Sequence, residues 1–440
     1  MGAMDGLMGR FLGNTAKFTD KQVAETLDIL VAHGVGRGAS DIHIEPHERF
    51  VLVRYRIDGV LRGIHKLPRQ ALATLLAVVK RRADLNTQET HAPQEGRYTA
   101  TVNDRAIEVR LSIMPVYGGE KAVLHLVEAL GKPTALEHLG FWGDGLTALQ
   151  SVLASPHGLV LVNAPRHHGA SSTLFGMLDQ LNSPLVSIAT IETQQHHRLP
   201  GVNHTYAVEG MVAVSDNLRA VLKQDPNIIL ISDLANSQVA SLSVDAATKG
   251  HLVLAGLHAN SSVAGVLRVR ASRVEPFLLA TALRTSIGQR LVRTLCPDCR
   301  ERYLLTPAEQ KELTRVFGIT TAAHVKRVHQ LEREAAASGL DTSGHLSSNP
   351  THLTHLWRPR ETGCEACDHT GYRGRTAITE VLRNSEHLQK TLLSPDIASV
   401  HSAQATVLKD GFIPMALDGL IKALCGQTTI TEVLRVTAAT

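Results

Sequence analysis

The sequence has no apolar stretch long enough to cross a membrane as a helix. Spanning a bilayer takes roughly 18 or more consecutive apolar residues, and the 440-residue sequence contains no such run. Residues 1–13 also lack the continuous apolar segment of a secretory signal. We therefore expect a cytosolic protein whose membrane association, where it has any, comes through a partner.

The sequence also lacks a large excess of charge of either sign. Its 45 Lys and Arg residues and 41 Asp and Glu residues give a formal net charge of +4. Nucleic-acid-binding domains concentrate basic residues in patches or stripes, so we expect no nucleic-acid partner. The apolar fraction of 43% is ordinary for a globular protein. The length suits two or three domains, each with its own core.

Cysteine is scarce, and four of the five cysteines are grouped. They form two C-x-x-C pairs, Cys296/Cys299 and Cys364/Cys367, while Cys425 stands alone. In a cytosolic protein this arrangement favours a metal site over disulfides. Four thiolates suit a closed, tetrahedral, structural Zn²⁺ site. A redox-active C-x-x-C is the alternative interpretation.

The stretch NAPRHHGASSTLF, residues 163–175, lacks the lysine of a phosphate-binding loop. It follows the apolar run GLVLV and precedes a predicted helix, which is the setting of the pattern G-x-x-x-x-G-K-[ST]. Only Gly169 and Ser171 match, because Ala164 replaces the first glycine and Ala170 replaces the lysine. Electrostatic elements that act on a transferring phosphoryl group are worth on the order of 10³–10⁵ in rate, so this loss is severe.

Three interpretations of this loop remain open. It hydrolyses ATP at an atypical site, it binds nucleotide weakly, or it only connects a strand to a helix. Arg166, His167 and His168 bring positive or partly positive charge to the loop, but they lack the lysine's anchored position. The candidate nucleotide-binding residues of the loop are Arg166, Gly169, Ala170, Ser171 and Ser172.

The N-terminal part of the chain predicts an α+β domain. Residues 19–38 have the capping and apolar spacing of a helix. The alternating segments FVLVRYRI and VLRGI, separated by DG, predict a β-hairpin, and RYTATV-ND-RAIEVRLSI predicts a second one. We assign residues 1–18 to a leader, 19–129 to an α+β domain and 130–140 to a linker.

From residue 141 the pattern changes to an α/β alternation. The runs GLVLV, LVSIATI, NIILIS and HLVLAGL are apolar on both faces and alternate with helical stretches, which indicates a parallel sheet covered by helices. We assign residues 141–292 to this domain. Residues 293–376 are assigned to a zinc-binding domain with a polar, partly disordered insertion at about 306–355. Residues 377–440 are assigned to a helical C-terminal domain.

Segments along most of the chain resemble the ATPases that drive type II secretion and type IV pilus assembly. The resemblance runs from about Val23 to Thr437 and includes GASDIHIEP, VRYRIDGVL, LRAVLKQDPNIILI, GHLVLAGLHAN, IGQRLVRTLCPDCR and GCEACDHTGYRGRTAITEVL. It implies a RecA-like domain that binds ATP and Mg²⁺, preceded by the family's second N-terminal domain. It also implies a hexameric ring acting on an inner-membrane platform protein. We expect the family's first N-terminal domain, which docks on that platform, to be absent.

The resemblance assigns catalytic roles in the α/β domain. Asp233 lies at the Walker B position, where the family usually has glutamate, and His258 belongs to the family's His box. Glu192 matches the first acid of the acidic box, whereas Thr193 and His196 replace later acids. Each has a plainer alternative as a strand-end acid, a cap or a structural histidine.

The resemblance also assigns roles to four arginines of the N-terminal domain. Arg54, Arg56, Arg97 and Arg110 match arginines that face the nucleotide in the family. Such arginines stabilise transition-state charge across a domain or subunit boundary. We take Arg97 and Arg110 as catalytic candidates and Arg54 and Arg56 as nucleotide-binding candidates. The alternative is a solvated polar face of a strand.

The departures from the family are selective, because they gather at the phosphate loop and the two acidic boxes. The fold-bearing segments and the cysteine pairs match. We therefore expect a ring subunit with weak or absent ATP hydrolysis, in a homo- or hetero-hexamer, with an active paralogue as a further partner. One alternative is an active motor in which Arg166 or His168 replaces the lysine. The other is a zinc-containing interaction scaffold unrelated to secretion.

Overall fold

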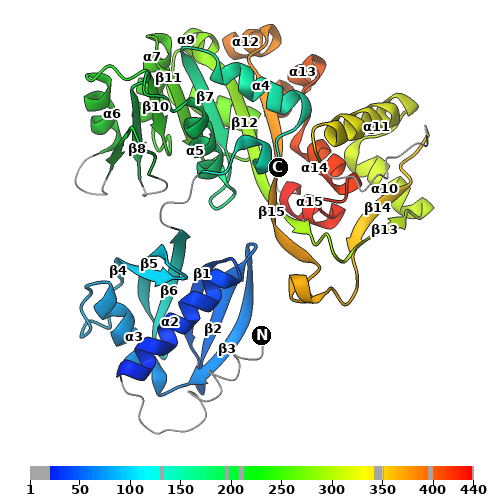
Figure 1. The fold of residues 1–440 in the computed structure, drawn as a ribbon. Coiled ribbons are helices and arrows are strands. Elements are labelled where there is room, and N and C mark those ends of the chain that lie inside the picture. Colours follow the sequence, from blue (N-terminus) through cyan, green and yellow to red (C-terminus); the bar gives the residue numbers. More distant parts are fainter. Residues whose placement is uncertain are drawn as a thin grey trace. The chain divides into compact units, whose positions relative to one another are not determined.

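A computed structural model of the chain describes residues 20–128, 133–193, 198–207, 213–340, 349, 351–394 and 400–438. The chain divides into two units, residues 1–131 and residues 132–440 (Figure 1). Each unit has its own buried apolar core. Among the helices in these described ranges, none combines the length and the apolar character that crossing a bilayer requires.

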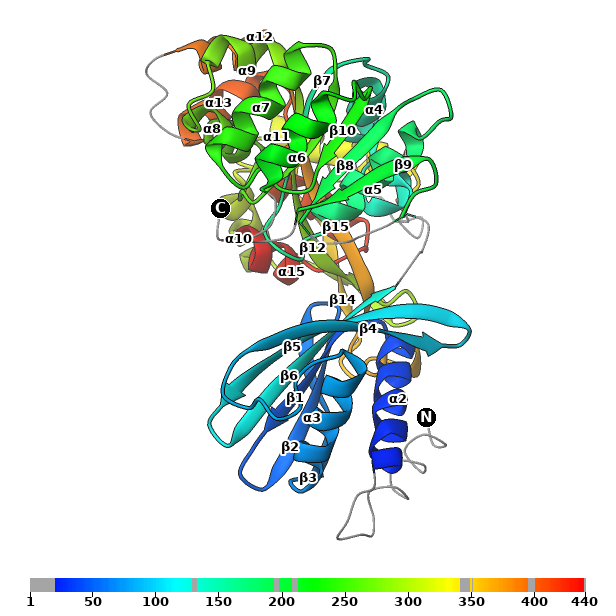
Figure 2. The ribbon, with the colours of Figure 1, turned by 90° about the vertical axis from the view of Figure 1, so that its left-hand side faces the viewer.

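The first unit is a six-stranded antiparallel sheet with two helices packed against it (Figure 2). The strand order is β3-β2-β1-β6-β5-β4. Both predicted hairpins are present, as β2–β3 and β4–β5. The elements are α2 (Asp20–Gly36), β1 (Ala39–Pro46), β2 (Phe50–Ile57), β3 (Val60–Pro68), α3 (Ala71–Arg82), β4 (Gln94–Val102), β5 (Arg105–Val116) and β6 (Gly119–Glu128).

Strand alternation decides which face of this sheet the helices cover. Val51, Val53 and Tyr55 of β2 are fully buried and belong to the same core as α2 and α3. Because successive side chains of a strand point to opposite faces, Arg54 and Arg56 take the face that the helices leave uncovered. The arginine candidates therefore lie on the polar face of the sheet.

The second unit is an α/β fold built on a seven-stranded sheet, as the α/β alternation predicts. The strand order is β15-β12-β7-β11-β10-β8-β9, and only β15 runs antiparallel to its neighbour. The strands are β7 (Gly158–Asn163), β8 (Ile188–Glu192), β9 (Val202–Tyr206), β10 (Ile228–Ile231), β11 (Leu252–Leu257), β12 (Leu283–Leu295) and β15 (Tyr372–Arg383).

Helices cover both faces of this sheet, because its central strands are apolar on both sides. In β7, Leu159 and Leu161 enter one core, and Val160 and Val162 enter the other. One face carries η1 (Leu136–Leu139), α4 (Gly143–Leu153) and α5 (Ala170–Leu181). The other face carries α6 (Val214–Leu222), α7 (Ser237–Thr248), α8 (Ser262–Ala271), α9 (Pro276–Ala282), α12 (Glu386–Leu393) and α13 (Val400–Val407).

The expectation of a partly disordered insertion at 306–355 was wrong for most of that stretch. It contains α10 (Pro307–Phe317) and α11 (Ala322–Ala337), and α11 packs on α14 (Met415–Leu424). Val325, Val328 and Leu331 are buried in α11. These few apolar residues at helical spacing suffice for an amphipathic helix even though most of its other residues are polar or small. Residues 341–348 and 350 lie outside the described residues.

Two of the expected domain boundaries fall inside strands of the main sheet. The boundary after residue 292 lies within β12, and the boundary after residue 376 lies within β15. The two strands pair from Thr285↔Arg383 to Leu295↔Tyr372, so one ribbon connects the sheet to the cysteine region. The remaining elements are β13 (Arg300–Leu304), β14 (His355–Pro359), η2 (Glu365–Cys367), η3 (Leu408–Asp410) and α15 (Ile430–Thr437).

Candidate functional site

The phosphate-loop segment connects β7 to α5 at the carboxyl edge of the parallel strands. Gly169 (φ 86°) and His167 (φ 64°) both have left-handed backbone, a conformation that favours glycine. A histidine in this conformation at residue 167 costs roughly 1 kcal/mol or more. The segment therefore keeps a strand–turn–helix shape of the kind in which backbone N–H groups converge on an anion.

The first turn of α5 brings no cation to this loop. Ala170 is the first residue of the helix, and Ser171 and Ser172 follow it. The loop is anchored on β12 instead, since Gln289 donates to the His168 carbonyl oxygen at 3.0 Å and accepts from Thr173 Oγ1 at 2.6 Å. A Cβ at residue 169 would approach Gln289 Nε2 to 2.7 Å, so the glycine is also required by close packing.

His168 cannot replace the lysine, which corrects one of the alternatives drawn from the sequence. Its Nδ1 accepts a hydrogen bond from the Leu291 backbone N–H at 3.0 Å, so the ring is turned toward β12. Burial, helped by the nearby Arg290, lowers the pKa of His168 to about 4. The imidazole is therefore neutral near pH 7, and Arg166 is left as the permanent cation of the loop.

Asp233 and His258 lie beside the loop. The Asp233 carboxylate follows β10, and its Oδ2 lies 3.8 Å from His258 Nε2. His258 Nδ1 is 3.2 Å from the Ala164 carbonyl oxygen, to which it donates. Burial raises the pKa of Asp233, and the charges of His258, Arg268 and Arg166 oppose that shift. Arg166 is thus close enough to Asp233 to interact with it electrostatically.

Glu192 is buried in the core of the second unit, and no part of its side chain is exposed. It accepts a hydrogen bond from Thr190 Oγ1 at 2.6 Å and lies 2.8 Å from His204 Nδ1. The Leu199 N–H donates to the other ring nitrogen of His204, so Nδ1 carries the proton and donates to the carboxylate. The structure therefore does not present Glu192 to solvent as a base. His196, a neighbour of this strand end, lies outside the described residues.

The contact of His204 with Glu192 was not predicted from the sequence. It lies on β9, and its ring stacks on Phe175 of α5 with centroids 6.5 Å apart. No motif marks it, because its role depends on β8 and β9 being neighbours in the sheet.

The four predicted arginines share one face of the first unit's sheet. A row of directly paired residues crosses five strands in the order Arg97, Arg110, His125, Asp41 and Arg56. Side chains opposite one another in paired strands point to the same face. The sheet thus brings together residues that lie more than 50 positions apart in the sequence.

Acidic residues accompany these arginines on the polar face. The close ion pairs are Arg54–Glu45 at 2.8 Å, Arg56–Asp41 at 3.1 Å and Arg110–Glu108 at 2.8 Å. Burial raises the pKa of Asp41, but hydrogen bonds from His125 and Ser40 and the charge of Arg56 hold it at about 2. The face is therefore a mixed-charge surface rather than a purely basic one.

The four paired cysteines form a cluster that can hold a metal ion. All four Sγ atoms lie within 4.8 Å of one another, and three separations are 3.7 Å (Cys296–Cys364), 3.8 Å (Cys299–Cys367) and 3.6 Å (Cys364–Cys367). A tetrahedral site with Zn–S bonds of about 2.3 Å has S···S separations of about 3.8 Å. The geometry fits zinc, whereas a disulfide needs about 2.05 Å.

The backbone around the cluster supports a thiolate at Cys367. The N–H groups of Cys364 and Gly371 lie 3.4 Å and 3.2 Å from its Sγ. Burial raises the pKa of Cys367, but these hydrogen bonds outweigh it and lower the pKa to about 6. Within the described part of the chain, no second group of His, Cys, Asp and Glu side chains has metal-binding geometry. His167 and His168 therefore do not belong to one, and His196 and His197 lie outside that part.

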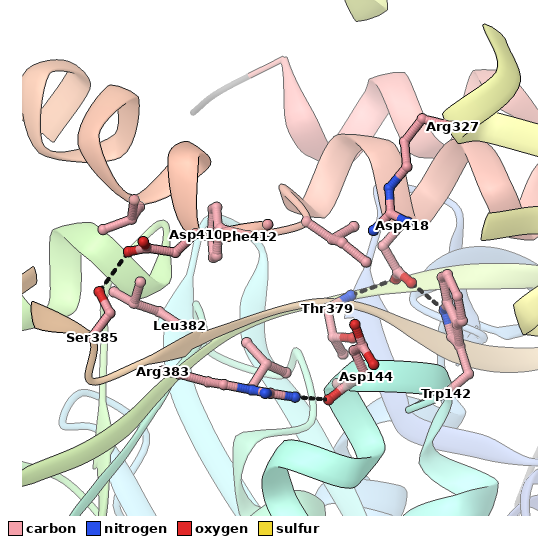
Figure 3. Close-up of a pocket in the computed structure, with 15 residues that line it drawn as sticks. Trp142, Asp144, Arg327, Thr379, Leu382, Arg383, Ser385, Asp410, Phe412 and Asp418 are labelled. Atoms are coloured by element: carbon pink, nitrogen blue, oxygen red, sulfur yellow. Dashed lines mark hydrogen bonds between the residues drawn. The ribbon is translucent and has the colours of Figure 1, made fainter. Parts of the chain in front are cut away.

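A pocket of about 320 Å³ lies beside α14, and no residue of the phosphate loop lines it (Figure 3). Asp418 at its edge accepts hydrogen bonds from the Trp142 indole, the Thr379 N–H and Lys422 Nζ. Arg383 donates to the Asp144 carbonyl oxygen. Asp418 and Arg383 thus have partners within the second unit, and the elements that line the pocket include α4, β15 and α14.

The second unit is an α/β fold whose arrangement is consistent with a RecA-like core. A phosphate-loop segment, an acid after a neighbouring strand and a histidine after a third strand meet at the carboxyl edge of a mainly parallel sheet, which is where open α/β sheets bind their ligands. The model of the family described as "Type II/IV secretion system protein" matches residues 17–435. The chain belongs to this family, as its resemblance in sequence predicted.

Relatives and solved structures agree with this assignment. The type II secretion system protein E of Aeromonas hydrophila is 33% identical over 419 residues, which cover 95% of this chain and 76% of that protein. The type II secretion system ATPase E of Vibrio cholerae is 33% identical over 423 residues, with the same shares. The X-ray structure of the Legionella pneumophila ATPase DotB matches with a TM-score of 0.67 and 16% identity over 97% of this chain and 98% of that one. This structural likeness shows the fold.

Proposed function

We propose that this chain is a cytoplasmic ring subunit of a type II secretion or type IV pilus machinery whose own ATP hydrolysis is weak or absent. The observation that carries the proposal is Ala170 at the first position of α5. The loop keeps the backbone shape for an anion, but the helix supplies no amine to neutralise the phosphates. An interaction scaffold unrelated to secretion has no support, because the chain belongs to the secretion family.

Two further features favour weak hydrolysis. Asp233 is one methylene shorter than the glutamate that the family usually has, and a misplacement of about 1 Å can cost about 10²-fold in rate. Glu192, the other acidic candidate, is held by Thr190 and His204 inside the core. Neither carboxylate is therefore well placed to order an attacking water.

The remaining parts suit assembly rather than catalysis. We assign the first unit to the family's PAS-like second N-terminal domain, with its arginine face directed at nucleotide or at a neighbouring subunit. The ring is a homo- or hetero-hexamer, and an active paralogue supplies hydrolysis. An inner-membrane platform protein receives the motion and keeps the ring at the membrane. The cysteine cluster holds structural Zn²⁺, and nucleotide with Mg²⁺ binds weakly at most.

The test compares ATP binding and turnover in three zinc-loaded proteins: the unmodified chain, Ala170→Lys and Ala170→Gln. Gln is about as long as Lys but uncharged, so it controls for side-chain size. We expect turnover near background in the unmodified chain and in Ala170→Gln. We expect Ala170→Lys to raise it by at least roughly 10²-fold, given the usual worth of charges on a transferring phosphoryl group. Turnover in the unmodified chain that Asp233→Asn abolishes would contradict the proposal.

A second candidate is an active motor in which Arg166 takes over the lysine's charge. The positive charge of Arg166, which acts to lower the pKa of Asp233, favours it. In that case Arg166→Gln abolishes turnover, whereas Ala170→Lys adds little. The same assays therefore separate the two candidates.

A further inference from the structure

A series of buried hydrogen bonds connects the start of the phosphate loop to the start of α14. Asn163 Nδ2 donates to Ser286 Oγ at 2.8 Å, and this hydroxyl donates to the Ser262 carbonyl oxygen at 2.8 Å. The Ser262 N–H and Oγ both donate to Glu380 Oε1, at 2.6 and 2.9 Å. Glu380 Oε2 accepts from the Met415 N–H at 3.1 Å. We call these five residues the buried relay.

The relay is closed to solvent and crosses several elements. Asn163, Ser262 and Ser286 have no exposed surface, and Glu380 is 4% exposed. Asn163 ends β7, Ser286 lies on β12, and Glu380 lies on β15; β7 pairs with β12, and β12 pairs with β15 (Figure 1). Because water cannot substitute for a missing partner here, each hydrogen bond depends on the next.

Glu380 is the junction of the relay, because its two carboxylate oxygens accept from the first turns of two different helices. Ser262 is the first residue of α8, and Met415 is the first residue of α14. A negative charge is favourable at a helix N-terminus, where backbone N–H groups lack partners within the helix. Burying a carboxylate is costly unless such partners are present. The two helices are thus held relative to each other by one side chain.

The backbone is shaped to admit the relay. A Cβ at Gly288 would approach Glu380 Cγ and Oε1 to 2.7 Å, and a Cβ at Gly265 would lie 1.7 Å from Asn163 Oδ1. Both glycines leave room for a relay side chain. Any residue larger than glycine at these positions forces the relay apart.

The end of the relay at β7 lies next to the two loops of the candidate site, the phosphate loop and the loop that carries His258. Asn163 immediately precedes Ala164, whose carbonyl oxygen accepts from His258. Ser262 follows His258 by four residues and begins the helix after its loop. At the other end, α14 packs on α11 and α15. The relay therefore connects the nucleotide side of the unit with its C-terminal helices.

We propose that Glu380 is a positioning residue that couples the phosphate loop and the His258 loop to α14. A displacement of α14, such as one imposed by a neighbouring protein, shifts Glu380 and, through Ser262 and Ser286, the residue from which the phosphate loop starts. The coupling holds whether or not the loop hydrolyses ATP, so it is independent of the proposed function.

The test is hydrogen–deuterium exchange on the full chain and on Glu380→Gln. Glutamine keeps the shape, but its amide nitrogen cannot accept, so one of the two helix N–H groups loses its partner. We expect exchange to accelerate about tenfold or more in peptides covering residues 163–170 and 413–417. The matched control is Glu432→Gln, which alters another buried carboxylate outside the relay. It should accelerate exchange around α15, while residues 163–170 should respond only as far as the accompanying loss of global stability requires, which urea unfolding of the same variant measures.

A second variant distinguishes coupling from general loosening. Ser286→Ala removes the middle link of the relay. In that background, Glu380→Gln should still affect residues 413–417 but add nothing at residues 163–170. Independent, additive effects at residues 163–170 would overturn the proposal, as would an equal response there to Glu432→Gln after correction for each variant's loss of global stability. If Glu380→Gln does not fold, Ser262→Ala takes its place: it removes one of the two hydrogen bonds that Ser262 donates to Glu380, so exchange at residues 163–170 should accelerate less than with Glu380→Gln and should not accelerate further in the Ser286→Ala background.

Discussion

Glu432 offers a sharp test of the electrostatics of the second unit. Its carboxylate is 2% exposed and lies on α15. It accepts from the backbone N–H of Arg293 at 3.1 Å, from the guanidinium of Arg293 at 2.8 Å and from that of Arg435 at 2.8 Å. Burial raises the pKa of Glu432, but these hydrogen bonds and charges prevail and lower it from 4.5 to about 2.

This shift has a definite sign and size. Each unit of pKa corresponds to about 1.4 kcal/mol, so a fall from 4.5 to about 2 stabilises the folded state by about 3 kcal/mol. The folded-state pKa is depressed, so the stabilisation is complete above the unfolded value near 4.5. It is lost as the pH falls from there through the folded value near 2. Glu432→Gln should therefore destabilise the second unit by about 3 kcal/mol at pH 7 and by little near pH 2.

Tryptophan fluorescence during urea unfolding measures this unit selectively. Trp142 and Trp357 are the two tryptophans of the sequence, and both are buried in the second unit. The control is Glu312→Gln, which removes an exposed ion pair with Arg315 and should leave the transition unchanged. A difference between Glu432→Gln and the unmodified chain that stays constant from pH 7 to pH 2 would refute the reasoning.

Three further predictions concern the metal cluster and the phosphate loop. A strong chelator should remove one equivalent of zinc from the unmodified protein, which a colorimetric zinc indicator measures. Cys367→Ser should lower the affinity for zinc steeply in the same assay, because the closed site needs four thiolates. His167→Gly should stabilise the second unit by roughly 1 kcal/mol in the urea assay, because glycine adopts φ 64° without strain; destabilisation would mean that the imidazole makes a contact worth more than the strain. Gln289→Leu should lower the free energy of unfolding by about 1–3 kcal/mol in the urea assay, because it leaves the Thr173 hydroxyl and the His168 carbonyl oxygen without their Gln289 partner. An unchanged unfolding midpoint would show that the loop does not need this anchor.

The fold of the second unit was largely predictable from strand pattern. β7, β10 and β11 are apolar on both faces, which is typical of strands buried in a parallel sheet. The helices α10 and α11 are not evident from composition, because most residues of this stretch are polar or small. Val325, Val328 and Leu331 lie three residues apart, which is the signal of a buried helix face.

The candidate site was predictable only where its residues are close in sequence. Ala170 and its neighbours identified the altered loop, and the family positions of Asp233 and His258 placed them beside it. The orientation of His168 was not predictable, because its ring nitrogen contacts Leu291, more than 120 positions away. The burial of Glu192 likewise depends on His204 in the next strand.

The same limit applies to the arginines of the first unit. Alternation within β2 places Arg54 and Arg56 on one face, which the sequence shows directly. The row from Arg97 to Arg56 requires the order of five strands, and this order follows from tertiary packing that no local pattern records.

The position of the cysteine cluster has a mechanical consequence. β12 and β15 form an antiparallel ribbon whose last pair, Leu295↔Tyr372, lies directly before Cys296. The chain between these two strands carries α10 and α11. A pulling force on that segment would break the hydrogen bonds of the ribbon one after another, starting at the Leu295↔Tyr372 end. With a metal ion bound, the four thiolates close the open end, so the first event under load must be rupture of a metal–sulfur bond. The cluster then acts as a stop that lets the segment with α10 and α11 transmit tension to the sheet without peeling β15, its outermost strand.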